Sequence, residues 1–173
     1  MPADRTVRAE RLLLRPLVEG DLDAYHLVMS QDAVGSQLPR GRGFTIDETR
    51  ALIEHWIRHW DEHGFGPWAV VEDDSDALIG HCGLQRLTES GETELLYAIG
   101  EQYWGHAFAT EAAKASTRQA FGAFELDELV GFVKPDNGRS QGVMRACGFA
   151  QVGRVHQWGL DLLKFRRGPE EAP

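Results

Sequence analysis

The chain has 173 residues, of which 42% are hydrophobic, and a formal net charge of −9. This length predicts a single domain with its own core, which we expect over residues 1–168, followed by a flexible tail at 169–173. No stretch of about 18 apolar residues occurs, so we expect no membrane association, and the acidic balance excludes nucleic acid as a natural partner.

The first residues, MPADRTVRAERL, are charged and lack the apolar segment of a secretory signal, so we expect a cytoplasmic protein. Cys82 and Cys147 have neither the spacing of a metal site nor that of a disulfide framework. Residues 1–100 carry 18 acidic and 9 basic side chains, whereas residues 101–173 carry 9 of each. A solvated acidic surface explains this asymmetry. The alternative is a first half that binds a cationic partner and a second half that binds an anionic one.

The N-terminal quarter predicts one strand, one helix and a loop. Residues 6–15 alternate weakly and contain many branched side chains, which predicts a first strand that ends at Pro16. A short helix follows, with Asp21 at its N-cap. Residues 31–44 contain several glycines and a proline, which is typical of a loop.

Thr45 and Glu48 match a capping box, which predicts a long helix that ends before Gly64. Three histidines recur every four residues along it: His55, His59 and His63. This spacing would stack three imidazoles on one side, which could suggest a metal site, but no acidic or cysteine partner is fixed by the sequence. We therefore expect these histidines to form a polar flank of an amphipathic helix, and we predict no metal.

The rest of the chain alternates between extended and helical segments. We expect strands at residues 67–72, 78–87, 93–99, 125–134, 149–155 and 158–165, and helices at residues 110–121 and 139–147. Strands that come first, followed by an alternation of strands and helices, predict a mixed α/β sheet.

In residues 94–110, ELLYAIGEQYWGHAFAT, an apolar strand runs into a turn of small residues and then into a helix. A helix N-terminus presents unpaired N–H groups and the positive end of the helix dipole, so it binds phosphate. Gly105, Ala107 and Ala109 would let a ligand approach the main chain closely. The alternative is an ordinary strand–turn–helix connection.

Four segments follow one another along the chain: RLLLRPL at residues 11–17, YWGHAFATEA at 103–112, PDNGRS at 135–140 and ACGFAQVG at 146–153. Together they resemble the GNAT superfamily of acyl-CoA-dependent N-acetyltransferases, and within it the RimJ/RimL-type group (ribosomal-protein N-acetyltransferase-like). The resemblance implies a single GNAT domain with a mixed, mostly antiparallel sheet of six to seven strands and about four flanking helices. It also implies a splay between the strands at 93–99 and 125–134.

The resemblance implies that acetyl-CoA is the co-substrate and that main-chain N–H groups of the turn bind its phosphates. These groups belong to Gly105, His106, Ala107, Phe108, Ala109 and Thr110. Glycine is usual in the family where Ala107 stands. An alanine permits right-handed helical φ, so the turn tolerates it if this position needs no positive φ.

Other residues would contact the rest of the cofactor. The resemblance implies that a main-chain N–H near Ala98 polarises the acetyl carbonyl, and that Ile99 contacts the pantetheine arm. It also implies that Asn137 hydrogen-bonds this arm and that Ser140 lies near the sulfur, although the Asn-Gly pair on its own is simply a good turn. Many relatives protonate the leaving thiolate with a tyrosine where Met144 stands here. Ser140, or a water that it holds, is therefore the candidate acid.

An acceptor amine must lose a proton before it attacks. An α-amine, with a pKa of about 8, needs only a modest base, whereas a lysine amine at about 10.4 is rarely neutral. The resemblance implies that Glu94 is the base, directly or through water. The alternatives are that Glu94 is a surface-facing strand carboxylate, or that His81 or His156 takes its role.

We therefore expect a cytoplasmic N-acetyltransferase that transfers acetyl by direct attack in a ternary complex. A protein N-terminal α-amine fits the resemblance as acceptor. A small amine such as an aminoglycoside, a polyamine or an amino acid is the second hypothesis. A non-catalytic acyl-CoA-binding module that uses its acidic first half for protein contact is the third. A homodimer is common among such proteins.

Overall fold

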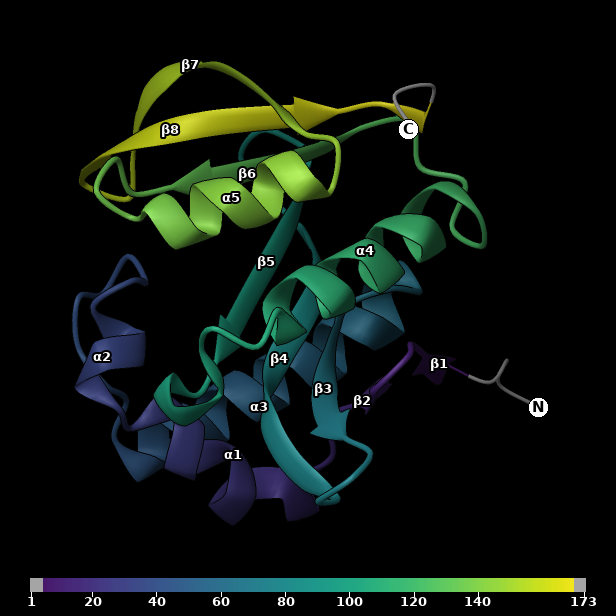
Figure 1. Ribbon diagram of the computed structural model, residues 1–173, viewed down its shortest axis with the longest axis vertical. Coiled ribbons are helices and arrows are strands. Elements are labelled where there is room, and N and C mark those ends of the chain that lie inside the picture. The colour runs from purple at the N-terminus through teal and green to yellow at the C-terminus, as the bar shows by residue number, and fades with distance from the viewer. Residues whose placement is uncertain (1–4, 170–173) are drawn as a thin grey trace.

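The computed structural model of the protein describes residues 5–169 (Figure 1). Its strands form one sheet in the order β1-β2-β3-β4-β5-β6-β8-β7. They are β1 (Val7–Arg8), β2 (Leu12–Pro16), β3 (Pro67–Glu72), β4 (Ala77–Arg86), β5 (Thr93–Ile99), β6 (Leu129–Val133), β7 (Ala150–Gln157) and β8 (Leu160–Arg167). The helices are α1 (Leu22–Met29), α2 (Asp32–Gly35), α3 (Ile46–His63), α4 (Phe108–Phe121) and α5 (Gly138–Ala146), with short 3₁₀ turns η1 (Glu19–Asp21) and η2 (Glu101–Tyr103).

Neighbouring strands are antiparallel except β5 and β6, which are parallel and share a single residue pair, Glu94 with Val130. Beyond this pair the two strands diverge (Figure 1). The expected splay is therefore confirmed, and so is the mixed, mostly antiparallel sheet. The sheet has eight strands rather than six to seven, because residues 6–15 form two short strands joined by a turn in which Ala9 N–H bonds Leu12 O at 2.9 Å.

The helices cover both faces of the sheet. On one face α4 lies against β4 and β5, and its fully buried alanines let it approach the strands closely. On the other face α1 and α3 pack together over Ala69 and Ala98. In Figure 1 α4 and α5 are in front and α1 and α3 lie behind. The short helix α2 occurs within the loop predicted at 31–44, which gives five helices rather than about four.

The capping box of α3 is confirmed. Glu48 N–H donates to Thr45 Oγ1 at 3.2 Å, Thr45 N–H donates to Glu48 Oε2 at 2.8 Å, and the helix stops at Gly64, whose φ is 74°. Asp21 stands at the N-cap of α1 but does not cap it. Its carboxylate instead forms a bidentate pair with Arg15, at 2.8 Å for both contacts.

The expectation of a polar flank is wrong for His59, which is buried. One ring nitrogen, Nδ1, lies 2.9 Å from Phe65 O, and the other accepts a hydrogen bond from Arg86 N–H at 2.9 Å. Both nitrogens are therefore used in a neutral ring that ties α3 to β4. Among the described residues no group of three or more histidine, cysteine or acidic side chains could hold a metal ion, and no helix is long and apolar enough to cross a membrane.

Several element boundaries differ from the prediction. Helix α4 begins at Phe108, two residues before the expected Thr110. The expected strand at 158–165 starts instead at Leu160, because Trp158 and Gly159 form the turn between β7 and β8. Of the expected tail at 169–173, residues 170–173 lie outside the described residues.

Candidate active site

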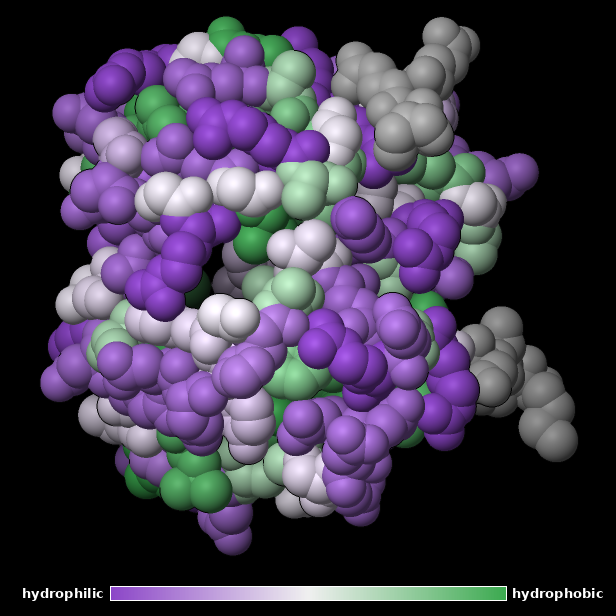
Figure 2. All heavy atoms as spheres, viewed as in Figure 1, coloured by the Kyte–Doolittle hydropathy of each residue, from purple (hydrophilic) through white to green (hydrophobic). Residues whose placement is uncertain are grey.

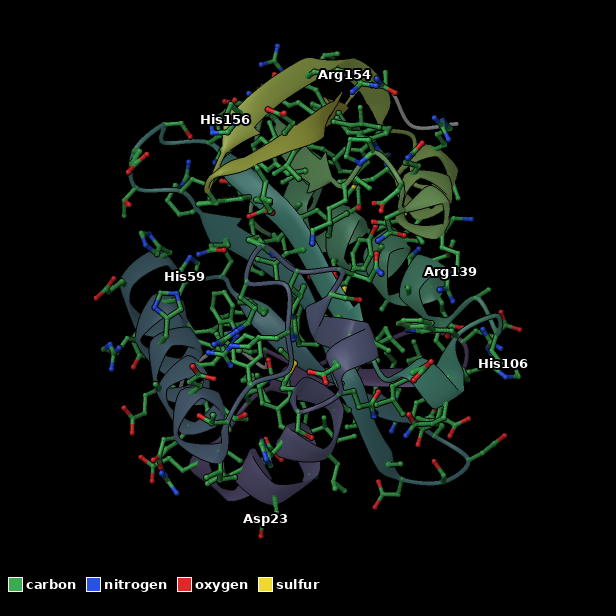
Figure 3. The ribbon with its side chains drawn as sticks, turned by 90° about the vertical axis from the view of Figure 1, so that its left-hand side faces the viewer. Asp23, His59, His106, Arg139, Arg154 and His156 are labelled. Carbon is green, nitrogen blue, oxygen red and sulfur yellow. The ribbon has the colours of Figure 1, made fainter. Side chains whose placement is uncertain are left out.

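A cavity of about 1460 Å³ lies where β5 and β6 diverge, and residues from both faces of the sheet line it. Figure 2 shows a hollow at this level of the molecule, between the half that carries α5 and the half below it. Every residue expected in the site lines this one cavity except His106: Glu94, Ala98, Ile99, Gly105, Ala107, Phe108, Ala109, Thr110, Asn137 and Ser140. The His106 side chain is exposed and points away (Figure 3).

The turn before α4 has the features of an anion site. The first helical hydrogen bond runs from Glu111 N–H to Ala107 O at 3.0 Å, so the N–H groups of Phe108, Ala109 and Thr110 have no acceptor within the helix. Gly105, at φ 81°, leaves open space where a side chain would stand. The main chain is thus accessible to a ligand with acceptor oxygens.

Ala107 adopts the left-handed conformation, with φ 61° and ψ 19°. The condition under which an alanine is tolerated without strain, a right-handed φ, is therefore not met. A left-handed alanine costs about 1–2 kcal/mol, because its Cβ approaches the following carbonyl oxygen. The turn keeps the geometry that glycine would give at this position, at the cost of strain.

Arg11, which begins the RLLLRPL segment, holds this turn from the connection between β1 and β2. Its Nε donates to Glu111 Oε2 at 2.8 Å and its Nη2 donates to the His106 carbonyl at 2.9 Å. The guanidinium also lies over the Phe108 ring, 4.4 Å from the ring centroid. Glu111 lies in the first turn of α4, where an unpaired carboxylate would repel phosphate. Arg11 both neutralises this charge and fixes the turn.

The main-chain groups of β5 alternate between β4 and the gap. Gly100 N–H donates to Ile79 O at 2.8 Å, and a Cβ built on Gly80 would meet the Ala98 carbonyl oxygen, so the Ala98 groups face β4. The Ile99 carbonyl faces the other way and accepts from the Trp104 indole N–H at 2.8 Å. An N–H directed at the gap therefore belongs to Tyr97 or Ile99 rather than to Ala98.

Glu94 is buried, with 8% of its surface exposed, so it is not a surface-facing carboxylate. No hydrogen bond or ion pair within residues 5–169 reaches its side chain. Burial raises the pKa of the Glu94 carboxyl to about 8. Since the side chain also lines the cavity, Glu94 can exchange a proton with a bound molecule near neutral pH.

Tyr97 contributes a hydroxyl group that sequence reasoning missed. Its oxygen lies 2.7 Å from Ser140 Oγ and donates to Ser140 O at 3.2 Å. Ser140 N–H in turn donates to Asn137 Oδ1 at 3.1 Å, which caps α5 and leaves the Asn137 amide N–H₂ available. Met144 is buried against Gly131 and has no proton to donate. The alternation of β5, with Leu95, Tyr97 and Ile99 on the α4 face, was the signal that could have indicated Tyr97.

The two alternative bases have other contacts. His81 is buried, its Nδ1 lies 2.7 Å from the Tyr25 hydroxyl, and burial lowers its pKa to about 4. His156 is exposed and its Nδ1 lies 2.9 Å from Asp161 Oδ1. Both line the cavity, but each ring already has a side-chain partner, whereas Glu94 has none among the described residues.

Comparison with known proteins identifies the family to which this site belongs. Residues 11–150 match the acetyltransferase (GNAT) domain family. The chain belongs to the GNAT acetyltransferases. YoaA, an uncharacterized N-acetyltransferase of Bacillus subtilis, is 24% identical over 153 residues, which cover 88% of this chain and 86% of the relative. The protein is accordingly an acetyl-CoA-dependent acetyltransferase.

Solved structures share the fold of this acetyltransferase. An acetyltransferase from Agrobacterium tumefaciens has a TM-score of 0.81 and 28% identity, over 94% of this chain and 93% of the other. RimJ of Mycobacterium smegmatis, in complex with CoA-disulfide, has a TM-score of 0.82 and 20% identity, over 99% and 91%. These likenesses confirm the expected GNAT fold, which the chain shares with RimJ.

Replacing Ala107 by glycine should stabilise the acetyltransferase. Glycine removes the left-handed strain but loses more entropy on folding, so the free energy of unfolding should rise by about 0.5–1 kcal/mol. Urea denaturation measures this change. Ala109→Gly, in the right-handed first turn of the same helix, is the matched control and should lower the free energy by about 0.5–1 kcal/mol. A destabilising Ala107→Gly would contradict the assigned strain.

Arg11→Gln should weaken binding of acetyl-CoA, because Glu111 would be left uncompensated beside the turn. We expect the KM for acetyl-CoA to rise about tenfold, a change of about 1.4 kcal/mol, with a smaller change in kcat. Arg8→Gln is the control, since Arg8 is exposed and pairs with Asp73, away from the turn. An unchanged KM in Arg11→Gln would exclude this role.

Proposed function

We propose that this acetyltransferase moves acetyl from acetyl-CoA directly to a primary α-amine, as found at a protein N-terminus. The observation that carries the proposal is the Glu94 carboxyl, which is buried and has no partner among the described residues. It lies in the same cavity as the turn before α4, residues 105–110, which we call the phosphate-type turn. Its pKa of about 8 lies close to that of an α-ammonium group, which is about 8. A proton can therefore pass between them with little free-energy change, which favours general base catalysis. A lysine side chain, at about 10.4, would be a poorer match.

The turn and the gap-facing edge of β5 have the groups that acetyl-CoA needs. N–H groups of residues 105–110 suit its phosphates, because an anion is bound well at a helix N-terminus. The gap-facing N–H groups of Tyr97 and Ile99 suit the pantetheine arm and the thioester carbonyl, and the free amide of Asn137 suits the arm. A prealigned donor at the developing oxyanion contributes about 3 kcal/mol to catalysis.

Tyr97 and Ser140 can donate a hydrogen bond to the sulfur of CoA as it leaves. Burial raises the pKa of the Tyr97 phenol, so this group keeps its proton at neutral pH and can donate a hydrogen bond. The Ser140 hydroxyl, 2.7 Å away, extends this donor toward the cavity. A thiol has a pKa of about 8.5, so its thiolate leaves without complete protonation and a hydrogen bond suffices.

Direct transfer is supported by the state of both cysteines. Cys82 and Cys147 are buried, and burial raises their pKa values to about 12 and about 11. Each thiol therefore stays protonated at neutral pH, whereas the thiolate is the nucleophile. Neither residue lines the cavity. An acetyl-enzyme on cysteine is thus unfavourable, and the acceptor amine attacks in a ternary complex.

A protein N-terminus is favoured over a polycation as acceptor. Of the acidic residues in the first hundred positions, the cavity is lined by Glu62, Glu89 and Glu94, with basic residues such as Arg58 and Lys134 among its other walls. The acidic excess is therefore spread over the surface instead of gathered at the site. A fold neighbour from Vibrio fischeri is a ribosomal-protein-S5-alanine acetyltransferase, at 14% identity.

The test is release of CoA from acetyl-CoA in the presence of an amine panel. The panel contains tetrapeptide amides with free N-termini, the same peptides with blocked N-termini and one free lysine, an aminoglycoside, a polyamine and free amino acids. We expect turnover on free N-termini. Turnover on small amines alone would support the second hypothesis. Binding of acetyl-CoA without turnover on any member would support the non-catalytic module.

Glu94→Gln should lower kcat/KM for a peptide acceptor about 100-fold at pH 7, because the proton acceptor is lost. The Glu94 carboxyl becomes ionised as pH rises through its pKa of about 8, and the α-amine becomes neutral over the same range. Wild-type kcat/KM should therefore rise with pH through about 8, and the variant should stay below it throughout. Rates from pH 6.5 to 9.5 measure this. Glu54→Gln, on the exposed side of α3, is the control, and an unchanged kcat/KM in Glu94→Gln would contradict the role of Glu94 as base.

Tyr97→Phe should lower kcat by about 10–100-fold, since a hydrogen bond to a charged group contributes about 1.5–3 kcal/mol. The KM for acetyl-CoA should change less than kcat, because the hydrogen bond strengthens only as the sulfur leaves. Steady-state kinetics measures both values. Tyr103→Phe removes another hydroxyl group from the cavity wall and is the control. A normal kcat in Tyr97→Phe would remove this residue from the mechanism.

A further inference from the structure

Trp158 stands at the tip of the β7–β8 hairpin in a conformation that suits it poorly. Gln157 pairs with Leu160, so the connecting loop has two residues, Trp158 and Gly159, with φ values of 53° and 75°. Two-residue turns with positive φ at both positions favour Asn-Gly or Gly-Gly, and a bulky residue at positive φ is an outlier. A tryptophan here therefore costs stability that an asparagine would not.

Exposure of the apolar indole ring to solvent is also unfavourable. Trp158 has 46% of its surface exposed and lines the cavity. One edge is anchored, since its ring meets Phe132 of β6 with centroids 5.3 Å apart and an interplanar angle of 77°. This contact leaves nearly half of the residue exposed. Strain together with an exposed aromatic surface at the rim of an active site indicates a contact that forms only when a ligand is bound.

The wall beside Trp158 is apolar and carries no net charge. Phe132 pairs with Lys164 across β6 and β8, so Phe132 shares a face with Leu160, Leu162 and Lys164. Phe132, Leu160 and Leu162 line the cavity. The Lys164 ammonium group lies 2.6 Å from a Glu92 carboxylate oxygen, which neutralises it. This wall suits an apolar or aromatic group, and it offers no charged partner to a second cation.

The hairpin tip lies on the side of the molecule away from the phosphate-type turn. His156, two residues before Trp158, is on the same side as His59 of α3, whereas His106 of the phosphate-type turn and Arg139 of α5 lie on the opposite side (Figure 3). Trp158 is therefore remote from the end that suits CoA phosphates. Since acetyl-CoA would occupy the end beside that turn, the side that carries Trp158 is left for the acceptor.

We propose that Trp158 is a specificity-determining residue that contacts the acceptor and selects amines carrying an apolar or aromatic group a few residues from the reacting nitrogen. This inference rests on the proposed transfer to an α-amine. In a peptide acceptor, the selected group would be the side chain of residue two, three or four. Trp158 would hold it against Phe132 and the two leucines, and the contact would offset the strain of the turn.

The test uses the full chain, acetyl-CoA and four peptide amides: Ser-Gly-Gly-Gly and three versions with one phenylalanine at position two, three or four. The wild type should turn over at least one phenylalanine peptide with about tenfold higher kcat/KM than the glycine peptide, the scale of one aromatic contact. Trp158→Asn should abolish this preference by raising the peptide KM, with kcat and the KM for acetyl-CoA within about twofold of wild type.

Stability separates this role from a structural one. Asparagine suits the turn, so Trp158→Asn should keep or raise the melting temperature while it loses selectivity. Trp158→Gly, which also suits the turn, provides a second variant should the first fold poorly. Leu27→Gln removes an exposed apolar side chain from α1, outside the cavity, and should change neither property.

Every other outcome overturns this inference, and the outcomes show whether the proposed function fails with it. No turnover of any peptide by the wild type would remove the proposed function and this inference together. Turnover without a phenylalanine preference, or a preference that survives in both Trp158 variants, would overturn this inference and leave the proposed function intact. A change of oligomeric state in both variants, measured by light scattering, would instead assign Trp158 to contact with a second copy of the chain.

Discussion

Strand β5 loses its neighbour on one side beyond Glu94, because β6 pairs with it only through Val130. Buried main-chain N–H and C=O groups without partners cost free energy, and a sheet normally satisfies them through its next strand. Here the next strand turns away, and a cavity takes its place. The protein meets part of the cost itself, since the Trp104 indole binds the Ile99 carbonyl. The remaining groups are available to a ligand that has the shape of an extended chain.

Other features around the cavity are also costly on their own. Glu94 is a buried carboxyl without a partner, Ala107 has a left-handed φ, and Trp158 occupies a turn that favours asparagine. Each breaks a rule that the rest of the chain follows, and each lines the same cavity. Sequences tend to violate local rules where function demands it, so their concentration here supports the location of the active site independently of family likeness.

The features that were predicted correctly from the sequence are those that neighbouring residues determine. The capping box of α3 and the strands β3 and β5 follow from neighbouring residues, and their bounds were predicted correctly. The site turn was located for the same reason, because small residues before a helix have a direct physical meaning. Its strain could not be predicted, since φ at Ala107 depends on how η2 leads into α4. Arg11 and Glu111 stand 100 positions apart, and nothing near either residue indicates the other. The donor assigned near Ala98 depended on ladder register, which alternation alone does not fix.

The divergence of β5 and β6 also divides the sheet into two parts. Strands β1–β5 form one leaf and β6–β8 form the other, and one ladder pair joins them. Side-chain links nevertheless cross the gap: Lys134 Nζ donates to Ser36 O at 2.6 Å, the Tyr97 hydroxyl donates to Ser140 O at 3.2 Å, Lys164 Nζ lies 2.6 Å from Glu92 Oε1, and the Arg139 guanidinium stacks over Trp104 at 4.0 Å. One hydrophobic core also runs across both leaves, from Leu95 and Ala112 to Leu163 and Phe165, so side-chain packing holds the leaves together where the ladder is interrupted. A co-substrate that fills the gap would complete the missing ladder. The main chain of β5 thus finds its remaining partners outside the protein, and binding of the co-substrate would couple the two leaves that together line the cavity.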